Sequence, residues 1–380
     1  MIRHFLSVTA GISLLLISVP LIAGEADELT RKINAISAEE TGYPEAVQAV
    51  AALSKMNAEA IPEVLAAMKQ ERPVAANWLR GAVEAIADKA RQEGSPISND
   101  TLIEFIQTQS HSAKSRSVAY HLLKQQDETA ALQLIPSFEN DASLELRLLA
   151  VEKLMDDARA NLAAEKTQEA IATYQQALTA TRNAHQASVI ADALKELEVE
   201  VDTTEHFGFL KNWHVIAAFE FAKGDGFDAV YPPEKEIDLA ATYPGKLIDE
   251  IPAPAKWQPL KLGPGEKSVD FNKAFAPVKE VVGYAVTTFD SDQAQEVELR
   301  WGSANATKVW VNGDLVASDK VFHAGDNFDQ YSAKAKLNPG ENTILVKLVQ
   351  NEQTQSWTNV WKFELRVCDH LGTAIADAKP

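Results

Sequence analysis

Hydrophobic positions follow a helical spacing in the first part of the chain. From residue 26 to about 205 they recur every three or four residues, which places them on one face of successive amphipathic helices. Pro62 fits the start of such a helix, because its missing N–H would have no partner in the first turn. The spacing predicts two early buried stripes, one formed by Ile61, Val64, Leu65 and Met68 and the other by Val47, Val50, Ala51 and Leu53.

Beyond Asp202 the spacing changes to alternation of apolar and polar residues. The stretches QEVELRW, ending at Trp301, and WKFELRV, ending at Val367, each predict a half-buried antiparallel strand. Asn312-Gly313 lies between strand residues and predicts a type I′ hairpin, since both residue types tolerate a positive φ. Pro339-Gly340 predicts a further turn before a strong strand. Short strands with turns at this spacing predict an antiparallel β-sandwich.

The helices of the first part are expected to come in pairs. NWLRGAVEAIADKA, from Asn77, and LELRLLAVEKLMDDA, from Leu144, share an Arg shortly before Ala-Val-Glu. The turn residue Asp141, followed by Arg147 in the next helix, resembles the HEAT repeat, and EAIATYQQAL resembles one helix of a tetratricopeptide unit. Pairs of this kind stack into an α-helical solenoid, because no pair buries its apolar face alone. A generic helical bundle is the alternative.

Two resemblances extend this interpretation. VWVNGDLV, KLNPGENTILVKL and WKFELRV resemble the galactose-binding-like jelly roll, including the non-catalytic sugar-binding sandwich of family 2 glycosidases. The series NWLRGAVEAI, SLELRLLAVEKL, HFGFLKNWHVI, GFDAVYPPEKEIDL, KVWVNG and NEQTQSWTNVWKFELRVCD is similar to secreted HEAT-like proteins of planctomycetes. That similarity covers nearly the whole chain after its first residues, and it implies an architecture without implying an activity.

The expected fold class is α plus β in two domains, a HEAT-like solenoid followed by a jelly roll. The predicted divisions are a signal peptide at 1–23, a helical repeat domain at 26–205, a connecting strap with the first strands of the sandwich at 206–282, a β-sandwich core at 283–372 and a tail at 373–380.

The first residues have the form of a secretory signal peptide. Arg3 and His4 precede an apolar run from Phe5 to Ile22, and small residues follow, so cleavage is expected after Ala23 or Ala26. This predicts a secreted or periplasmic protein. A retained membrane anchor is the alternative, although Ser, Thr, Gly and Pro interrupt the run.

Composition and charge exclude several classes of partner. The chain has 380 residues, of which 46% are hydrophobic, and these are sufficient for packed cores. Its formal net charge of -18, with no run of Lys and Arg, would repel nucleic acid and an anionic membrane surface. Cys368 is the only cysteine, so no disulfide forms within the chain, and no nearby His pattern makes it a nucleophile or metal ligand. No catalytic residue and no cofactor is predicted.

The stretch QNEQTQSWTN is the best candidate for ligand binding. It leaves a strand as a polar loop and presents Trp357 among amide side chains. An aromatic face stacks on the apolar side of a pyranose, while amides both donate to and accept from its hydroxyls. The alternative is that Trp357 continues the inward row of Asn359, Trp361 and Phe363 and closes the core. The candidate ligand-binding residues are Trp357, Asn351, Gln353, Gln355 and Asn359.

Acidic loop residues suggest two further sites. FDSDQ and AGDNFDQY would hold a structural Ca²⁺ through the carboxylates of Asp290, Asp292, Asp326 and Asp329. GDGFDAVYPPEKEIDL lacks the spacing of a calcium loop, and its Glu234 would serve a hydrolase only with a second carboxylate across the substrate. We expect instead that Phe227 and Tyr231 pack on the sandwich while the prolines stiffen the strap.

The sequence therefore favours a non-catalytic secreted binding protein. Its helical repeats would contact protein, and its sandwich would recognise carbohydrate or another cell-surface ligand. A scaffold of the cell envelope that binds no sugar is the first alternative. A glycoside-processing hydrolase is the second, and it would require a cleft with two carboxylates near Trp357 or Glu234.

Overall fold

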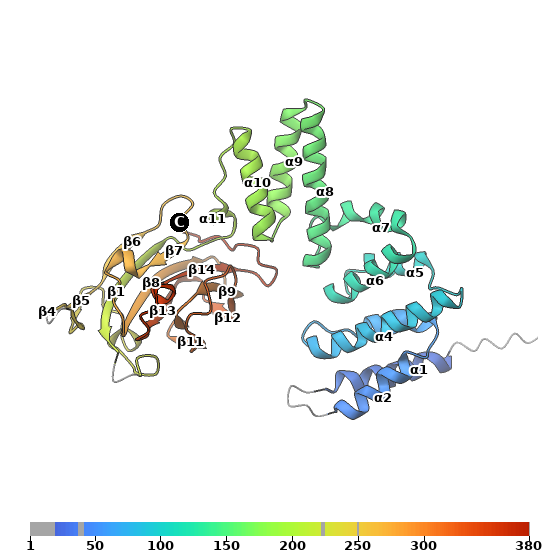
Figure 1. Ribbon diagram of the computed structural model, residues 1–380, viewed down its shortest axis with the longest axis horizontal. Helices are drawn as coiled ribbons and strands as arrows, with labels where there is room; N and C mark the ends of the chain where they lie inside the picture. The colour runs from blue at the N-terminus through green and yellow to red at the C-terminus, as the bar shows by residue number, and fades with distance from the viewer. Residues whose placement is uncertain (1–19, 37–41, 222–224, 249–250, 380) are drawn as a thin grey trace, which may run out of the picture. The chain divides into compact units, whose positions relative to one another are not determined.

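The protein contains helices first and antiparallel sheets afterwards (Figure 1). The computed structural model describes residues 20–36, 42–221, 225–248 and 251–379. The transition from helices to strands falls between α11 (Thr203–His206) and β1 (Asn212–Glu220). This confirms the change from helical to alternating pattern that was predicted after Asp202. Most of the predicted signal peptide, residues 1–19, lies outside the described ranges, and α1 begins at Pro20. Within those ranges no helix combines the length and apolar character needed to cross a bilayer.

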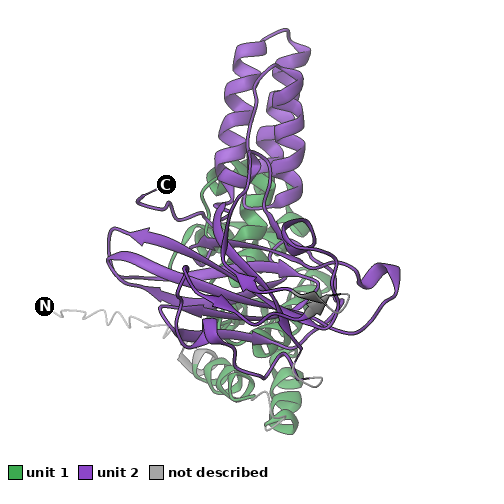
Figure 2. Ribbon diagram, turned by 90° about the vertical axis from the view of Figure 1, so that its left-hand side faces the viewer, with its two compact units in different colours: residues 1–150 green, residues 151–380 purple. Residues whose placement is uncertain are grey.

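The chain divides into two compact units, residues 1–150 and 151–380 (Figure 2). The first unit is helical, and the second contains further helices followed by the sheets. The helices are α1 (Pro20–Asn34), α2 (Tyr43–Leu53), η1 (Ala58–Ala60), α3 (Ile61–Ala66), α4 (Pro73–Gln92), α5 (Asn99–Gln107), α6 (Ala113–Gln126), α7 (Glu128–Leu134), η2 (Ile135–Phe138), α8 (Leu144–Ala163), α9 (Thr167–Ala180), α10 (Ala184–Glu196), α11 (Thr203–His206), η4 (Pro232–Glu234), α12 (Phe271–Ala274) and η5 (Ser356–Thr358).

Polar side chains define where several helices begin. The hydroxyls of Ser98 and Ser112 accept hydrogen bonds from the third backbone N–H beyond them, and the Asp127 carboxylate does the same for α7. These bonds satisfy N–H groups that have no partner within the helix. Pro62 and Pro73 lie in the first turns of α3 and α4, where a missing N–H costs little.

One of the two predicted helical stripes is correct. Ile61, with Val64, Leu65 and Met68, is fully buried in the core of the first unit. The prediction for α2 is correct for Leu53, which is fully buried, and Val50 packs against the core, but it is wrong for Val47 and Ala51. Val47 is 55% exposed, and the buried face is formed by Ala46, Ala49 and Leu53. Alanines at the contact let α2 approach α1 closely, so the smaller side chains face inward there.

The second unit contains two larger antiparallel sheets. The six-stranded sheet has the order β11-β10-β13-β8-β1-β6, and the four-stranded sheet has the order β12-β9-β14-β7. The strands are β1 (Asn212–Glu220), β2 (Thr242–Tyr243), β3 (Leu247–Ile248), β4 (Ile251–Pro252), β5 (Ala255–Lys256), β6 (Gln258–Lys261), β7 (Ser268–Asp270), β8 (Val281–Ser291), β9 (Gln295–Ser303), β10 (Ala306–Val311), β11 (Asp314–Asp319), β12 (Tyr331–Leu337), β13 (Gly340–Gln350) and β14 (Lys362–Cys368).

The two sheets share one hydrophobic core. Phe289 and Val346 from the larger sheet pack in the same cluster as Trp301, Trp361 and Phe363 from the smaller sheet and its approach. The opposite face of the larger sheet carries a second cluster, in which Phe219, Tyr284 and Leu345 pack with residues of the strap such as Phe227 and Trp257. The central strands β8 and β13 are therefore buried on both faces.

The hairpin prediction is confirmed, and one strand prediction needs correction. Asn312 and Gly313 join β10 to β11 with φ of 52° and 87°, as a type I′ turn requires. β9 alternates between buried and less buried residues, as expected, but β14 is covered on both faces. Its Glu364 and Arg366 are 4% and 1% exposed. Lys267 pairs with Glu364, and the rings of Phe207 and Phe328 lie against the Arg366 guanidinium.

Candidate functional site

Trp357 points outward from the end of the larger sheet. It lies in η5, in the loop between β13 and β14, and it is 63% exposed. Its ring meets the His323 ring edge-on, with centroids 5.4 Å apart and planes at 85°. The interpretation in which Trp357 closes the core is therefore wrong. Trp361 and Phe363, from the same predicted row, are buried.

A network of hydrogen bonds fixes the loop that carries Trp357. The Thr358 hydroxyl lies 2.7 Å from each of the carbonyls of Gln353 and Gln355, which share its single proton. The Thr358 carbonyl in turn accepts from Lys279 Nζ at 2.6 Å and from the buried Gln350 side chain at 3.2 Å. Because Thr358 is fully buried beside Trp357, the exposed indole stands on a rigid turn.

The other predicted ligand residues divide into two groups. Asn351 is only 7% exposed, and its Oδ1 accepts from His323 Nε2 at 3.0 Å and from the Gln353 N–H at 3.2 Å. It therefore organises the loop and is not positioned to bind a ligand directly. Gln353, Gln355 and Asn359 are exposed around Trp357.

His323 is the member of this site that the sequence did not reveal. Its Nε2 lies 3.0 Å from Asn351 Oδ1, and its Nδ1 is buried without a hydrogen bond within the described residues. His323 has a φ of 61° in the loop after β11, and its backbone N–H donates to the Ala304 carbonyl at 2.5 Å. Nothing in the local pattern of that loop indicates a contact with residues around Trp357.

The four predicted calcium ligands lie mostly against cations. Asp290 is 7% exposed and accepts from Lys379 Nζ at 2.9 Å, while Asp292 is exposed. Asp326 pairs with Lys362 at 2.7 Å. Over the described ranges no three His, Cys, Asp or Glu side chains converge as a metal site would require. The calcium sites therefore stay a prediction.

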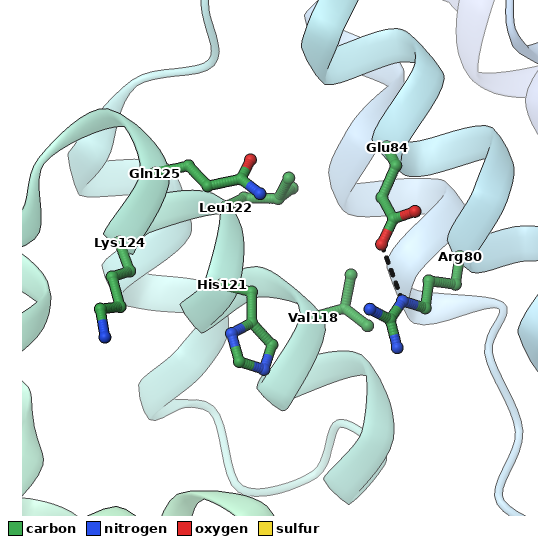
Figure 3. A pocket seen from close by; sticks show the side chains of 7 residues that line it. All are labelled: Arg80, Glu84, Val118, His121, Leu122, Lys124 and Gln125. Atoms are coloured by element: carbon green, nitrogen blue, oxygen red, sulfur yellow. Dashed lines mark hydrogen bonds and ion pairs between the residues drawn. The ribbon is translucent and has the colours of Figure 1, made fainter.

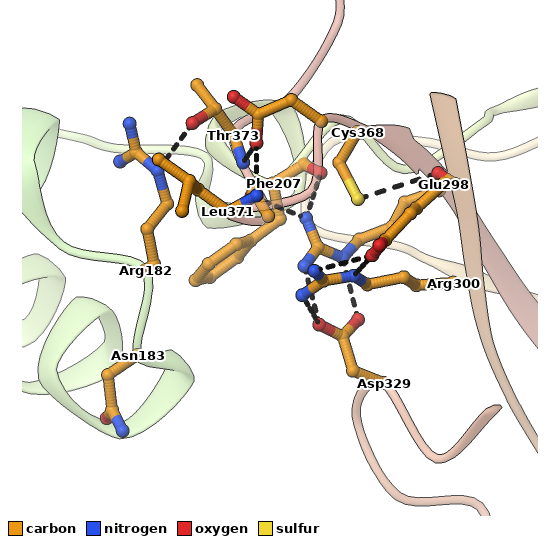
Figure 4. A network of polar contacts seen from close by, with 12 residues as sticks. Arg182, Asn183, Phe207, Glu298, Arg300, Asp329, Cys368, Leu371 and Thr373 are labelled. Carbon is orange, nitrogen blue, oxygen red and sulfur yellow. Dashed lines mark hydrogen bonds and ion pairs between the residues drawn. The ribbon is translucent and has the colours of Figure 1, made fainter. Parts of the chain in front are cut away.

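Asp329 belongs to a network that joins the sheets to the preceding helices of the second unit (Figure 4). Its carboxylate accepts from Arg366 Nε at 2.7 Å and Nη2 at 2.6 Å, and from Arg300 Nη1 at 3.1 Å. The Arg366 guanidinium lies over the rings of Phe207 and Phe328, and it also donates to the Phe207 carbonyl at 3.2 Å. Within the described residues the Asp329 carboxylate is thus paired with two arginines.

Cys368 lies beside this network. The thiol is fully buried, and Sγ donates to the Glu298 carbonyl at 3.6 Å. Burial raises the pKa of the thiol to about 11, so the nucleophilic thiolate is disfavoured.

A buried lysine fixes the part of the strap after Asp225 to the larger sheet. Phe227 is 4% exposed and Tyr231 packs in the same cluster, as the sequence predicted. Lys347, fully buried in β13, donates to the carbonyls of Phe227 at 3.0 Å and Ala229 at 2.6 Å and to Glu234 Oε1 at 2.9 Å. All three protons of the ammonium group are therefore used, and burial lowers its pKa.

The helical unit carries a groove of its own (Figure 3). A cavity of about 390 Å³ opens between α4 and α6. Its floor is Val118 and Leu122, and its walls are formed by Arg80 and Glu84 from α4 and by His121, Lys124 and Gln125 from α6. Arg80 Nε donates to Glu84 Oε1 at 2.7 Å, and the side chains of His121 and Lys124 on the opposite wall are exposed.

Comparisons with known proteins give no family. No family model and no curated protein matches the chain. Solved structures with some likeness include a GH31 α-xylosidase from Xanthomonas citri, with 13% identity, coverage of 30% of this chain and 15% of that chain, and a TM-score of 0.17. A β-glucosidase from Kluyveromyces marxianus in complex with glucose has 11% identity, coverage of 78% and 36%, and a TM-score of 0.26. The chain thus spans 36% of the length of that β-glucosidase, and TM-scores this low support no conclusion about fold or activity.

Proposed function

We propose that this is a non-catalytic, secreted or periplasmic binding protein whose sheets recognise carbohydrate through the loop around Trp357. The observation that carries the proposal is the 63% exposure of Trp357 on a turn fixed by Thr358. Leaving an indole in water forgoes the free energy of burying it, and the hydrogen-bonded turn that holds it outward supports a surface that a partner covers.

The surroundings of Trp357 favour a sugar as that partner. The exposed amides of Gln353, Gln355 and Asn359 can each donate and accept, which matches the hydroxyls of a pyranose. The indole supplies the flat apolar face on which a sugar ring stacks. Because hydrogen bonds already order the turn, binding involves a smaller loss of conformational entropy.

The finer architecture belongs to the same proposal. The six-stranded and four-stranded antiparallel sheets around one core support a jelly-roll sandwich. The turn residue Asp141 supports HEAT-like repeats, because its carbonyl accepts from Arg147 at 2.8 Å and its carboxylate accepts two bonds from Arg116 in α6. We infer that stacked helix pairs form a solenoid that contacts protein, for which the groove between α4 and α6 offers a surface.

Affinity electrophoresis in gels containing soluble polysaccharides tests the sugar site on the full-length protein. We expect Trp357→Ala to weaken retention about tenfold or more, as for a central aromatic contact. Leu315→Ala is the matched control, since Leu315 is also an exposed apolar residue of this unit, at 52%. If no polysaccharide retards the protein, or if Trp357→Ala runs as the wild type does, the sugar role is wrong and the envelope scaffold is favoured.

The hydrolase alternative requires two carboxyl groups that face each other across a substrate. Glu234 and Glu236 line one small pocket, but both come from the same turn of the strap. Glycosidases place their two carboxyl groups on opposite sides of the scissile bond. We therefore expect no release of nitrophenol from nitrophenyl glycosides. Release that Glu236→Gln abolishes would contradict the non-catalytic proposal.

A further inference from the structure

A second concave site lies on the flank of the larger sheet. A pocket of about 160 Å³ separates the strap from the hairpin of β10 and β11. Trp310 and Leu345 come from the sheet, and the segment from Pro233 to Ile237 forms the opposite wall. Gly313 in the hairpin turn and Thr343 in β13 complete the lining.

The carboxylate of Glu234 forms part of one wall of this pocket, and three hydrogen bonds hold one of its oxygens. Glu234 Oε1 accepts from Lys347 Nζ at 2.9 Å, from the Tyr231 N–H at 3.4 Å and from the Tyr284 hydroxyl. Among the described residues none donates to Oε2. The side chain is 8% exposed, so the carboxylate cannot swing away from this position without breaking those bonds.

Several other polar groups of the lining also lack a hydrogen-bond or ion-pair partner among the described residues. In the part of the chain that the structure describes, the carboxylate of Glu236, the ammonium of Lys235 and the hydroxyl of Thr343 have no hydrogen bond or ion pair. The Trp310 indole N–H likewise has no partner there, and its ring is only partly buried. The pocket thus combines one aromatic face with both donors and acceptors.

We propose that this pocket binds a single neutral pyranose residue, such as the terminal sugar of a glycan. At about 160 Å³ the pocket is small and open to solvent, so we assign to it one ring of a ligand whose remainder faces solvent. Trp310 would stack on the apolar face of the ring, while Glu234 Oε2, Glu236 and Thr343 would accept from its hydroxyls. Small ligand sites of this kind are mostly apolar, with a few convergent polar groups.

The charges of the lining favour a neutral sugar over a charged one. Lys347 already balances Glu234, and Lys235 stands beside Glu236, so the pocket has no net charge to offer an amino sugar or a uronic acid. The lining of this pocket includes none of the residues around Trp357. The proposal for this pocket can therefore be tested separately from the function proposed above.

Saturation-transfer NMR of the full-length protein with methyl glycosides tests this site. The probes are methyl β-D-galactopyranoside, methyl β-D-glucopyranoside and methyl α-D-mannopyranoside, with glucosamine and galacturonic acid as charged probes. We expect transfer to at least one neutral glycoside and to neither charged sugar. Glu236→Gln is expected to weaken that affinity about tenfold, as for the loss of a hydrogen bond to a charged group.

Two further variants distinguish the possible sites. Thr343→Val is expected to weaken binding without unfolding, since Thr343 is only partly buried and the two side chains have similar shapes. Trp357→Ala should leave intact the part of the glycoside binding that Glu236→Gln and Thr343→Val remove. The proposal is overturned if the folded protein receives no transfer from any neutral glycoside, if a charged sugar is preferred, or if Trp357→Ala abolishes binding that Glu236→Gln and Thr343→Val leave intact.

Discussion

His206 gives the second unit a pH-dependent stability. Its Nε2 donates to the Thr181 carbonyl at 3.2 Å, which joins α11 to the end of α9. Burial lowers the pKa of His206 below 6.5, and the nearby Arg182 and Arg366 lower it further, although the bond to Thr181 opposes this. The neutral ring is therefore favoured in the folded protein, and the unfolded chain binds the extra proton.

Stability should accordingly be complete above about pH 6.5 and decline as the pH falls through the folded pKa of His206. One proton limits this contribution to about 1.4 kcal/mol per pH unit. Urea unfolding between pH 5 and 7.5 measures the slope. We expect His206→Gln to flatten it, whereas His185→Gln, an exposed histidine of α10, should not. Equal slopes in the wild type and His206→Gln would contradict the assignment.

Single residues also mark the limit of what the sequence could predict about the candidate site. Trp357 was identifiable because a tryptophan among amides in a loop between strands stands out locally. The role of Asn351 was not, because it depends on His323, which is 28 residues away in the chain. Glu234 and Lys347 pair across a separation of 113 residues, so no local pattern could associate them.

At the scale of elements, a buried ion pair connects α6 to the turn before α8. Arg116 donates to Asp141 Oδ1 at 2.8 Å and Oδ2 at 2.5 Å, and both side chains are 1% exposed. Removing one partner leaves a charge buried without compensation. We therefore expect Asp141→Leu to lower the free energy of unfolding by about 3–5 kcal/mol.

An exposed pair of similar chemistry is the matched control for this prediction. Arg80 and Glu84 are each about half exposed on α4, and Glu84→Gln should cost no more than about 0.5 kcal/mol. Guanidinium unfolding followed by circular dichroism at 222 nm compares the two variants. Similar small losses for Asp141→Leu and Glu84→Gln would show that the buried pair adds nothing to stability.

Elements were predictable where one local signal decides their structure. The hairpin at Asn312-Gly313 depends on backbone conformation at two residues, and the sequence identified it. β14 was predicted to have one exposed face, because its alternation is local, whereas the side chains that cover this face are Lys267, Phe207 and Phe328 from other segments. In α2 the periodicity was correct but the buried face was not, since packing against α1 favoured alanine over Val47.

At the scale of the molecule, the helices after residue 150 belong with the sheets. Ala187 of α10 packs in one cluster with Phe207 and Phe209, and Phe328 from the loop before β12 packs against it. Arg182 also donates to the Thr373 hydroxyl at 3.0 Å, so the residues after β14 contribute to the same connection. A fragment of residues 151–380 retains all of these contacts, whereas a fragment that begins at residue 212 loses two buried phenylalanines.

We expect the fragment 151–380 to unfold cooperatively and the fragment 212–380 to melt at a lower temperature. Losing even one buried phenylalanine costs about 3 kcal/mol or more, which for a chain of this size lowers the midpoint by roughly 6–12 °C. Phe207→Ala in the longer fragment separates the loss of this contact from the truncation itself, and differential scanning calorimetry compares all three. Equal midpoints for the two fragments would mean that the sheets need none of the helices, and that the second unit effectively begins at β1.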